Sequence, residues 1–356
     1  GAPAAVTATL HRGQGGLDRF VTSLVSAWTH GAPTDWDTFY AATTSTGPPR
    51  RVPLPTYPFQ HQPYWPRPAE LAGVVSRAGL TAPDHPLLAA AVKLATGDGM
   101  VATALWSLRT HPWLAGHAVP GAAAVPGTAL VEVVIRAGTE LGCGQIADLT
   151  MHAPLVVPRH EQIQVQIVVG AADASGWRPV TLHARPAGDD GGMWTQHATG
   201  TLVPPAVVPS DLAAWPPPGA QPVAVDRFYA EMTRRGYDFG PTSQCMRAAW
   251  LRNTEIFAEV ALPDQACADA NRFGLHPALF DAALQAASLR PDADHSRMVA
   301  PFSWQGVCLH AAGVTALRVR LTAIGPETVT VLLADATGAP VASIESVALR
   351  PVTDAT

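Results

Sequence analysis

Hydrophobic and polar positions divide the chain into stretches with different periods. In residues 16–30 the apolar side chains recur every three or four positions, which predicts one amphipathic helix. From residue 76 onward, apolar and polar residues alternate over short stretches, as they do in antiparallel strands with one buried face. These stretches include ATALWSLRT, QIQVQIVVG, RPVTLHARP and MWTQHATGTLV. A short helical region is therefore followed by a larger region rich in strands.

A single long helix interrupts the first group of strands. Residues 128–141 have a helical pattern that is apolar on most sides, with Leu130, Val131, Val133, Val134, Ile135 and Leu141. A helix with so little polar surface is usually buried. An antiparallel sheet wrapped around such a helix is the hot-dog arrangement, which belongs to the α+β class.

The same order of elements returns after a proline-rich bridge at residues 205–222. The pattern there predicts helices at 224–236 and 276–289, strands at 246–252, 255–263 and 314–325, and a C-terminal hairpin that turns at DATGAP. We therefore expect a double hot dog, in which two antiparallel sheets each wrap around a long apolar helix. Its halves are residues 76–204 and residues 223–356.

Residues 1–75 have a different composition. Prolines recur within residues 53–68, which excludes a regular helix and favours extended chain. Aromatic residues lie among these prolines, whereas disordered linkers are usually poor in aromatics. We expect this segment to lie against a neighbouring surface; a disordered linker is the alternative.

Overall composition narrows the class of protein. A length of 356 residues with 47% hydrophobic residues fits about two packed domains plus a connector. The net charge of -5 provides no basic field for nucleic acid. The 4 cysteines are widely spaced, without a zinc-binding cluster, so we expect reduced thiols.

The sequence shows neither a secretory leader nor the run of about 18 apolar residues that a membrane helix needs. We expect a cytoplasmic protein.

The strongest chemical signal is the segment HAVPGAAAVP at residues 117–126, which continues into Gly127 and the apolar helix. A histidine just ahead of a helix N-terminus places a base beside backbone N–H groups that lack intrahelical acceptors. This pairing suits chemistry next to a carbonyl group.

The spacing His117-x3-Gly121-x4-Pro126 resembles the HxxxGxxxxP signature of dehydratase domains from modular polyketide synthases and related fatty acid synthases. Further along, LHPALFDAALQA contains Asp281 and Gln285 in the DxxxQ pattern of that family. The resemblance runs in the family's order over residues 76–353.

Between these motifs, RGYDFGPTSQCMRAAW is similar to the family's GYxYGPxF element. Tyr237 matches its first tyrosine, whereas Phe239 replaces the second tyrosine and Ser243 replaces the last phenylalanine. By the same resemblance, residues 1–75 are similar to the linker that follows the acyltransferase of such synthases.

The resemblance implies dehydration of a β-hydroxyacyl thioester to an α,β-unsaturated thioester in polyketide biosynthesis. This reaction needs a base for the α-proton and an acid for the leaving hydroxide. Histidine has an ordinary pKa of about 6.5 and can act as the base, whereas an aspartic acid can donate only where burial raises its pKa. We assign His117 as the base and Asp281, which has apolar sequence neighbours, as the acid. The N–H of Gly127 would stabilise the developing charge on the thioester oxygen.

The resemblance further implies roles in binding the substrate. Gln285 would orient Asp281, and Tyr237 would donate a hydrogen bond near the β-hydroxyl group. Gly121, Pro126 and Ser243 would line the substrate site. No cofactor or metal is expected in this domain, because protein groups can supply both the proton transfer and the polarisation of the carbonyl. An acyl carrier protein would deliver the substrate on its phosphopantetheine arm.

Each of these residues also has a structural interpretation. The chain contains 13 histidines, and an arbitrary histidine is more often structural than catalytic. His111 lies six residues before His117 and fits a packed junction between strand and loop. Asp281 could instead cap a helix, and Tyr237 could be a core aromatic residue.

Competing motifs are weaker. GCGQIA at residues 142–147 imitates the dinucleotide fingerprint but follows a helix where a strand is required, so we interpret it as a helix C-cap. The sequence has no GxSxG elbow and no GxxxxGK[ST] loop, which leaves hydrolase and nucleotidase functions without an anchor.

Several positions depart from the family pattern. Ala124, Val125 and Leu130 differ from the residues common before and within the helix, and Gly116 stands where an aspartate commonly precedes the histidine. Together with Ser243, these mostly smaller residues indicate a roomier substrate tunnel.

Two other functions stay open. A variant of the enzyme could dehydrate and then close a pyran ring or shift the double bond. A catalytically silent domain could instead serve as a dimeric scaffold and dock for the carrier protein. The expected partners are an acyl carrier protein, neighbouring acyltransferase and ketoreductase domains of the same polypeptide, and a second copy of the chain.

Overall fold

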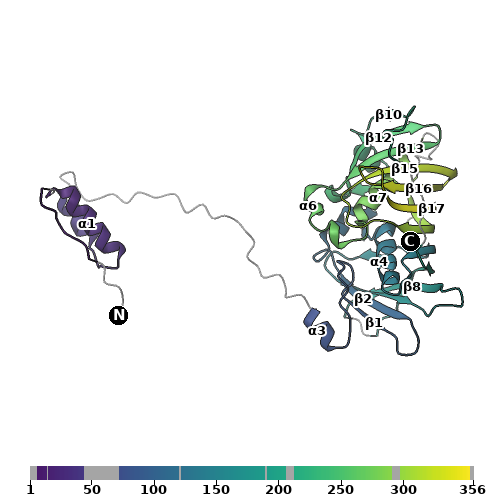
Figure 1. Ribbon diagram of the computed structural model, residues 1–356, viewed down its shortest axis with the longest axis horizontal. Helices are drawn as coiled ribbons and strands as arrows, with labels where there is room; N and C mark the ends of the chain where they lie inside the picture. Colours follow the sequence, from purple (N-terminus) through teal and green to yellow (C-terminus); the bar gives the residue numbers. More distant parts are fainter. Residues whose placement is uncertain are drawn as a thin grey trace. The chain divides into compact units, whose positions relative to one another are not determined.

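The computed structural model describes residues 6–13, 15–43, 72–119, 122–188, 191–205, 212–290 and 297–352, with the side chains of 43, 72–74, 117–119 and 122 excepted. The chain divides into two compact units, Gly1–Pro66 and Arg67–Thr356, which are described separately here (Figure 1).

The first unit contains two helices. Helix α1 (Leu17–Thr29) confirms the amphipathic helix expected at residues 16–30, and α2 (Trp36–Thr43) follows it. Trp28 of α1 meets Trp36 edge to face, with ring centroids 5.9 Å apart. The segment at residues 53–68 lies outside the described residues.

A sheet of 13 strands forms the framework of the second unit. All its strand pairs are antiparallel. In spatial order the strands are β1 (Ala90–Lys93), β2 (Met100–Trp106), β7 (Ile163–Val169), β8 (Arg178–Pro186), β9 (Thr195–Val203), β5 (Gln145–Met151), β14 (Val299–Leu309), β17 (Pro340–Pro351), β16 (Thr328–Ala334), β15 (Ala316–Gly325), β13 (Glu255–Ala261), β12 (Met246–Arg252) and β10 (Gln221–Val223).

The first half of the sheet wraps around helix α4 (Gly127–Thr139), as expected (Figure 1). The helix packs against β5, β7, β8 and β9. Val131, Val133 and Val134 are fully buried along it. The apolar pattern therefore predicted both the helix and its burial.

The second half is built in the same way around helix α7 (Pro277–Gln285), which packs against β13 and β15. Every residue of α7 is buried. The remaining short elements of this unit are α3 (Ala72–Arg77), α5 (Phe228–Arg234), α6 (Asp264–Cys267) and the 3-10 turns η1 (Pro112–Gly116), η2 (Pro241–Ser243), η3 (Ala270–Arg272) and η4 (Ala286–Leu289). The architecture is the expected double hot dog.

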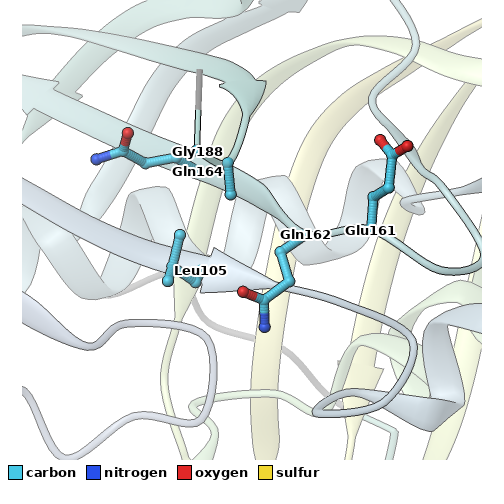
Figure 2. A pocket seen from close by; sticks show the side chains of 6 residues that line it. Leu105, Glu161, Gln162, Gln164 and Gly188 are labelled. Atoms are coloured by element: carbon cyan, nitrogen blue, oxygen red, sulfur yellow. The ribbon is translucent and has the colours of Figure 1, made fainter. Parts of the chain in front are cut away.

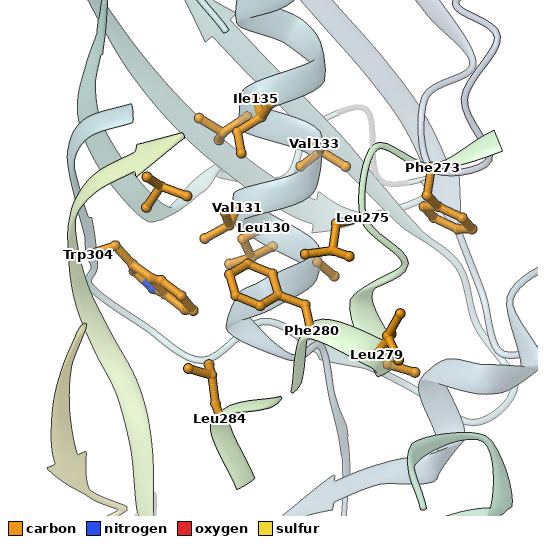
Figure 3. Packing of buried hydrophobic residues seen from close by; sticks show 14 of the residues in the cluster. Leu130, Val131, Val133, Ile135, Phe273, Leu275, Leu279, Phe280, Leu284 and Trp304 are labelled. Carbon is orange, nitrogen blue, oxygen red and sulfur yellow. The ribbon is translucent and has the colours of Figure 1, made fainter. Parts of the chain in front are cut away.

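The two halves share one sheet, a feature that the sequence pattern did not reveal. Strand β5 of the first half pairs with β14 of the second, where Leu149 faces Trp304. Figure 3 shows Phe280 of α7 close to Leu130 and Val131 of α4. Pairing β5 with β14 satisfies backbone groups that each separate sheet would leave open at its edge.

Both expected turns are present. The C-terminal hairpin joins β16 to β17, and Gly338 in its turn has φ +93°. Gly142, with φ +75°, follows the end of α4 and precedes β5. The sequence GCGQIA is therefore a helix C-cap, as predicted, because only glycine adopts positive φ without strain.

Candidate functional site

A second, small sheet joins the two halves at the histidine motif. It contains β3 (His117–Val119), β4 (Ala122–Ala124) and β6 (Val156–Val157) from the first half and β11 (Asp238–Phe239) from the second. In the register of β3 and β11, His117 is opposite Phe239. Two motifs separated by more than a hundred residues thus become neighbouring strands.

Two glycines allow the close approach of these strands. The backbone N–H of Gly240 donates a hydrogen bond to the carbonyl of Gly116 over 2.8 Å. A Cβ atom on Gly240 would lie 2.7 Å from the Cα atom of Gly116, and one on Gly116 would lie 3.2 Å from the Cα atom of Gly240. The contact therefore favours glycine at position 240 most strongly, whereas a side chain at position 116 would need the neighbouring strand to shift by only a few tenths of an ångström.

The structure places the backbone of His117 at the start of β3. Its side chain and the whole of Gly121 lie outside the described residues. The roles predicted for these two residues therefore stay predictions.

Asp281 occupies the middle of helix α7. Asp281 is buried, with only 7% of its surface exposed. The side-chain amide nitrogen of Gln285, one turn later, donates a hydrogen bond to Oδ2 of Asp281 over 2.9 Å. The helix N-cap is His276, whose Nδ1 accepts from the N–H of Ala278. Asp281 is therefore not a capping residue.

Tyr229 of α5 completes this arrangement, and the sequence analysis did not identify it. Its hydroxyl donates to Oε1 of Gln285 over 3.2 Å and accepts from the N–H of Met246 over 2.9 Å. Nε2 of Gln285 also donates to the carbonyl of Ser243 over 3.3 Å. The side chain of Ser243 is buried at this point, so the position lies directly beside the pair of Asp281 and Gln285.

Three titratable side chains of this region are neutral at neutral pH. Burial raises the pKa of the Tyr229 and Tyr237 hydroxyls above the ordinary value. Burial also raises the pKa of the Cys245 thiol to about 12. The surroundings of the acid are thus poor in solvent and lined by uncharged donors.

The hydroxyl of Tyr237 is held by β14. It accepts from the N–H of Val299 over 2.7 Å and donates to the carbonyl of the same residue over 3.1 Å. Its ring stacks on Phe239, with centroids 5.6 Å apart. The predicted hydrogen bond from Tyr237 to a substrate hydroxyl stays a prediction.

The N-terminus of α4 lies against the N-terminus of α7. Helix α4 begins at Gly127, and its N-cap is the buried residue Pro126. Pro126 supplies no side-chain hydrogen bond to the helix. The hydroxyl of Thr128 donates to the carbonyl of Pro277 over 3.2 Å. The first N–H groups of a helix lack intrahelical acceptors, which places such donors at the junction of the two helices.

A buried glutamate, also absent from the sequence analysis, joins the two halves farther along α4. Both oxygens of Glu132 accept hydrogen bonds: from the N–H of Gly274 over 2.6 Å, the N–H of Leu275 over 3.0 Å and Nε2 of His85 over 3.1 Å. Glu132 and His85 are each only 3% exposed. These bonds fix the segment that leads into α7.

Two other histidines have structural contacts. The ring nitrogens of His111 lie within hydrogen-bonding distance of Oγ1 of Thr110 and the carbonyl of Pro86, and burial lowers its pKa. Burial also lowers the pKa of His276 to about 4. Both line a cavity of about 330 Å³ together with Trp113.

A separate hollow of about 480 Å³ lies along β2 and β7 (Figure 2). Its lining consists of Leu105, Glu161, Gln162, Gln164, Ala187 and Gly188. It contains none of the predicted site residues.

Metal ligands do not gather in the described part of the chain, which holds no group of three or more His, Cys, Asp or Glu side chains suited to a metal ion. Within the same residues, no helix is long and apolar enough to span a membrane.

Two family models match the chain. The model described as "Polyketide synthase dehydratase domain" matches residues 85–185, and the model described as "Polyketide synthase dehydratase N-terminal domain" matches residues 208–356. A component of the pikromycin polyketide synthase of Streptomyces venezuelae is 48% identical over 97% of this chain. The aligned region is 9% of that component, so the chain spans a small part of this relative.

Solved structures show the same likeness. A structure from work on dehydratase substrate selection for the borrelidin and fluvirucin polyketide synthases is 42% identical, with a TM-score of 0.75 over 79% of this chain and 100% of that chain. A bifunctional dehydratase-cyclase domain in ambruticin biosynthesis is 39% identical, with a TM-score of 0.70 over 77% of this chain and 100% of that chain. This likeness confirms the predicted double hot-dog fold.

Proposed function

Because the chain belongs to the family of polyketide synthase dehydratase domains, which are hydro-lyases, we propose that it dehydrates a β-hydroxyacyl thioester carried by an acyl carrier protein, with His117 as base and Asp281 as acid. The observation that supports this assignment best is the placement of Asp281. It is buried on α7, bonded to Gln285, and lies on a helix that contacts the N-terminus of α4.

In the proposed reaction His117 removes the α-proton of the thioester. Negative charge develops on the thioester oxygen, where the N–H of Gly127 stabilises it. The bond between the β-carbon and the hydroxyl oxygen then breaks, and Asp281 supplies the proton that lets the hydroxide leave as water. His117 gains one proton and Asp281 loses one, so a proton transfer after product release restores both groups.

The direct test is incubation of the protein with a short 3-hydroxyacyl thioester, followed by mass spectrometry. We expect a product lighter by one water, formed equally well with and without a strong chelator, because the proposed chemistry needs neither a metal nor a redox cofactor. Phosphopantetheine enters only as the arm that delivers the substrate. Loss of activity after chelation and its recovery with zinc would contradict the metal-free mechanism.

A dehydratase that also cyclises is the second candidate, since the dehydratase-cyclase domain noted above is 39% identical. A substrate with a distal hydroxyl group separates the two activities. A simple dehydratase yields the open unsaturated thioester, whereas a cyclase yields a saturated ring of the same mass. Absence of both products would support a silent scaffold, and migration of the alkene would reveal an isomerase.

We expect the small side chain at position 243 to admit branched substrates. Ser243→Phe adds a ring beside Gln285 and Asp281, and overfilling a packed site commonly costs about 1 to 3 kcal/mol. The ratio of kcat/KM for α-methyl-branched over unbranched thioesters should therefore fall by roughly 10- to 100-fold. Ser175→Phe, in an exposed turn, is the control. An unchanged ratio in Ser243→Phe would show that this position does not shape the substrate site.

The proposed assembly is a homodimer that works with an acyl carrier protein and with acyltransferase and ketoreductase domains of the same polypeptide. The N-terminal hot dog would lie near the twofold axis. Its strand β1 ends the 13-stranded sheet, and an open edge favours pairing. Light scattering at micromolar concentration should give twice the chain mass of 37.2 kDa. A single-chain mass would contradict the dimer.

A further inference from the structure

The hydroxyl of Tyr229 contacts the side chain that contacts the proposed acid. It donates to Oε1 of Gln285, and Nε2 of Gln285 donates to Oδ2 of Asp281. The N–H of Met246 donates to the Tyr229 oxygen. Two acceptors face the hydroxyl proton, Oε1 of Gln285 at 3.2 Å and the carbonyl of Ser243 at 3.4 Å, and Oε1 is the nearer of the two. The three side chains therefore form one directed chain of hydrogen bonds.

The direction of this chain depends on which way the Gln285 amide faces. The oxygen and nitrogen of an amide have nearly the same shape, so only the hydrogen-bond network decides between two orientations. Two groups fix the observed one: the carbonyl of Ser243 accepts from Nε2, and the Tyr229 hydroxyl donates to Oε1. The reversed amide would place two acceptor oxygens, Oε1 and the Ser243 carbonyl, against each other, and the Tyr229 hydroxyl would lose its nearer acceptor.

The amide orientation determines where the proton of Asp281 resides. An oxygen that accepts an N–H bond behaves as the carbonyl oxygen of a neutral carboxyl group, so the proton is held on the other oxygen, Oδ1. A reversed amide would accept a bond from the carboxyl group and draw its proton toward Gln285, away from any substrate.

Contacts of its aromatic ring also hold Tyr229 beside the proposed site. It meets Phe239 edge to face with centroids 6.2 Å apart, and Phe239 is paired with His117 between β11 and β3. Tyr237 cannot substitute for it, since its hydroxyl is bonded to the backbone of Val299.

We propose that Tyr229 is a positioning residue that holds the Gln285 amide with its N–H toward Asp281, so that the acid carries its proton on Oδ1. This inference rests on the proposed function, because it concerns the same acid. The residue that it assigns, Tyr229, lies outside the three sequence motifs that resemble those of the family.

The test begins with Tyr229→Phe, assayed with a 3-hydroxyacyl thioester. Losing one hydrogen bond in the chain should lower kcat by about tenfold, the effect expected of a single such bond. KM should stay within about twofold, because in this proposal Tyr229 acts through Gln285 and not on the substrate. Thr233→Ala is the matched control: it removes a hydrogen bond from the Thr233 hydroxyl to the backbone carbonyl of Tyr229 in the same helix, and full activity is expected.

A double-mutant cycle separates positioning from general support of the fold. If Tyr229 acts through the amide, Tyr229→Phe should change kcat by less than about twofold in a Gln285→Met background. A tenfold loss in both backgrounds, or a loss confined to KM, would overturn the proposal. Thermal unfolding of each variant verifies that it is folded.

The outcomes also distinguish this inference from the proposed function. If the parent protein releases no water from any tested thioester, the proposed function fails and the role of Tyr229 fails with it. If the parent is active and Tyr229→Phe retains its full kcat, only the role of Tyr229 is wrong.

Discussion

Replacing Asp281 with asparagine is expected to lower the rate of dehydration by about 10²- to 10⁴-fold. Asparagine keeps the size of the side chain and can still accept the bond from Gln285, but it has no acidic proton to give to the leaving hydroxide. The fold should persist, because the hydrogen bond at Oδ2 needs only an acceptor. Single-turnover dehydration of a 3-hydroxyacyl thioester provides the measurement, and Asp264→Asn, in the exposed first turn of α6, is the control.

His117→Ala is expected to cause a loss of similar size by removing the base. Because both groups act in one reaction, the double variant should be little slower than either single variant. His152→Ala, on the exposed surface, should leave the rate unchanged. Full activity of a well-folded His117→Ala protein would disprove the assignment of the base.

Apolar periodicity identified the main elements of the fold from sequence. The helix expected at residues 128–141 is α4, observed at Gly127–Thr139, and its burial follows from its apolar surface. The continuity of the sheet was not predictable in this way. Periodicity tells which face of a strand is buried, whereas the pairing of Leu149 with Trp304 depends on how the two halves meet.

The candidate site was partly accessible to the same reasoning. Spacing alone placed Asp281 and Gln285 on one face of a helix, and the structure gives them a hydrogen bond. Tyr229 and Glu132 carry no motif. Gln285 lies 56 residues from Tyr229, and the partners of Glu132 lie 47, 142 and 143 residues away in sequence. The one available signal was the single acidic residue of helix α4, which stands among apolar positions, since a charge there must find buried partners.

Glu132 links the helix of the first half to the helix of the second. Its carboxylate accepts bonds from two successive backbone N–H groups, at Gly274 and Leu275, just before α7 begins. A Cβ atom on Gly274 would lie 2.7 Å from Cδ2 of Leu309 and 3.2 Å from Oε1 of Glu132. A side chain at this position would therefore require both the Leu309 side chain and the carboxylate to move.

We accordingly expect Glu132→Ala to lower the free energy of unfolding more than Glu140→Ala does. The change leaves three buried donors without an acceptor, and removing one partner of a buried polar network costs about 3 to 5 kcal/mol. For a protein of this size, whose unfolding entropy is about 2.1 cal/mol/K per residue, that loss corresponds to a fall in Tm of roughly 4 to 8 °C. Glu140→Ala is the matched control, because Glu140 forms a half-exposed ion pair with Arg136, and such pairs contribute at most about 1 kcal/mol. Thermal unfolding followed by circular dichroism measures both variants. Equal shifts in Tm would show that the buried carboxylate does not hold the two halves together.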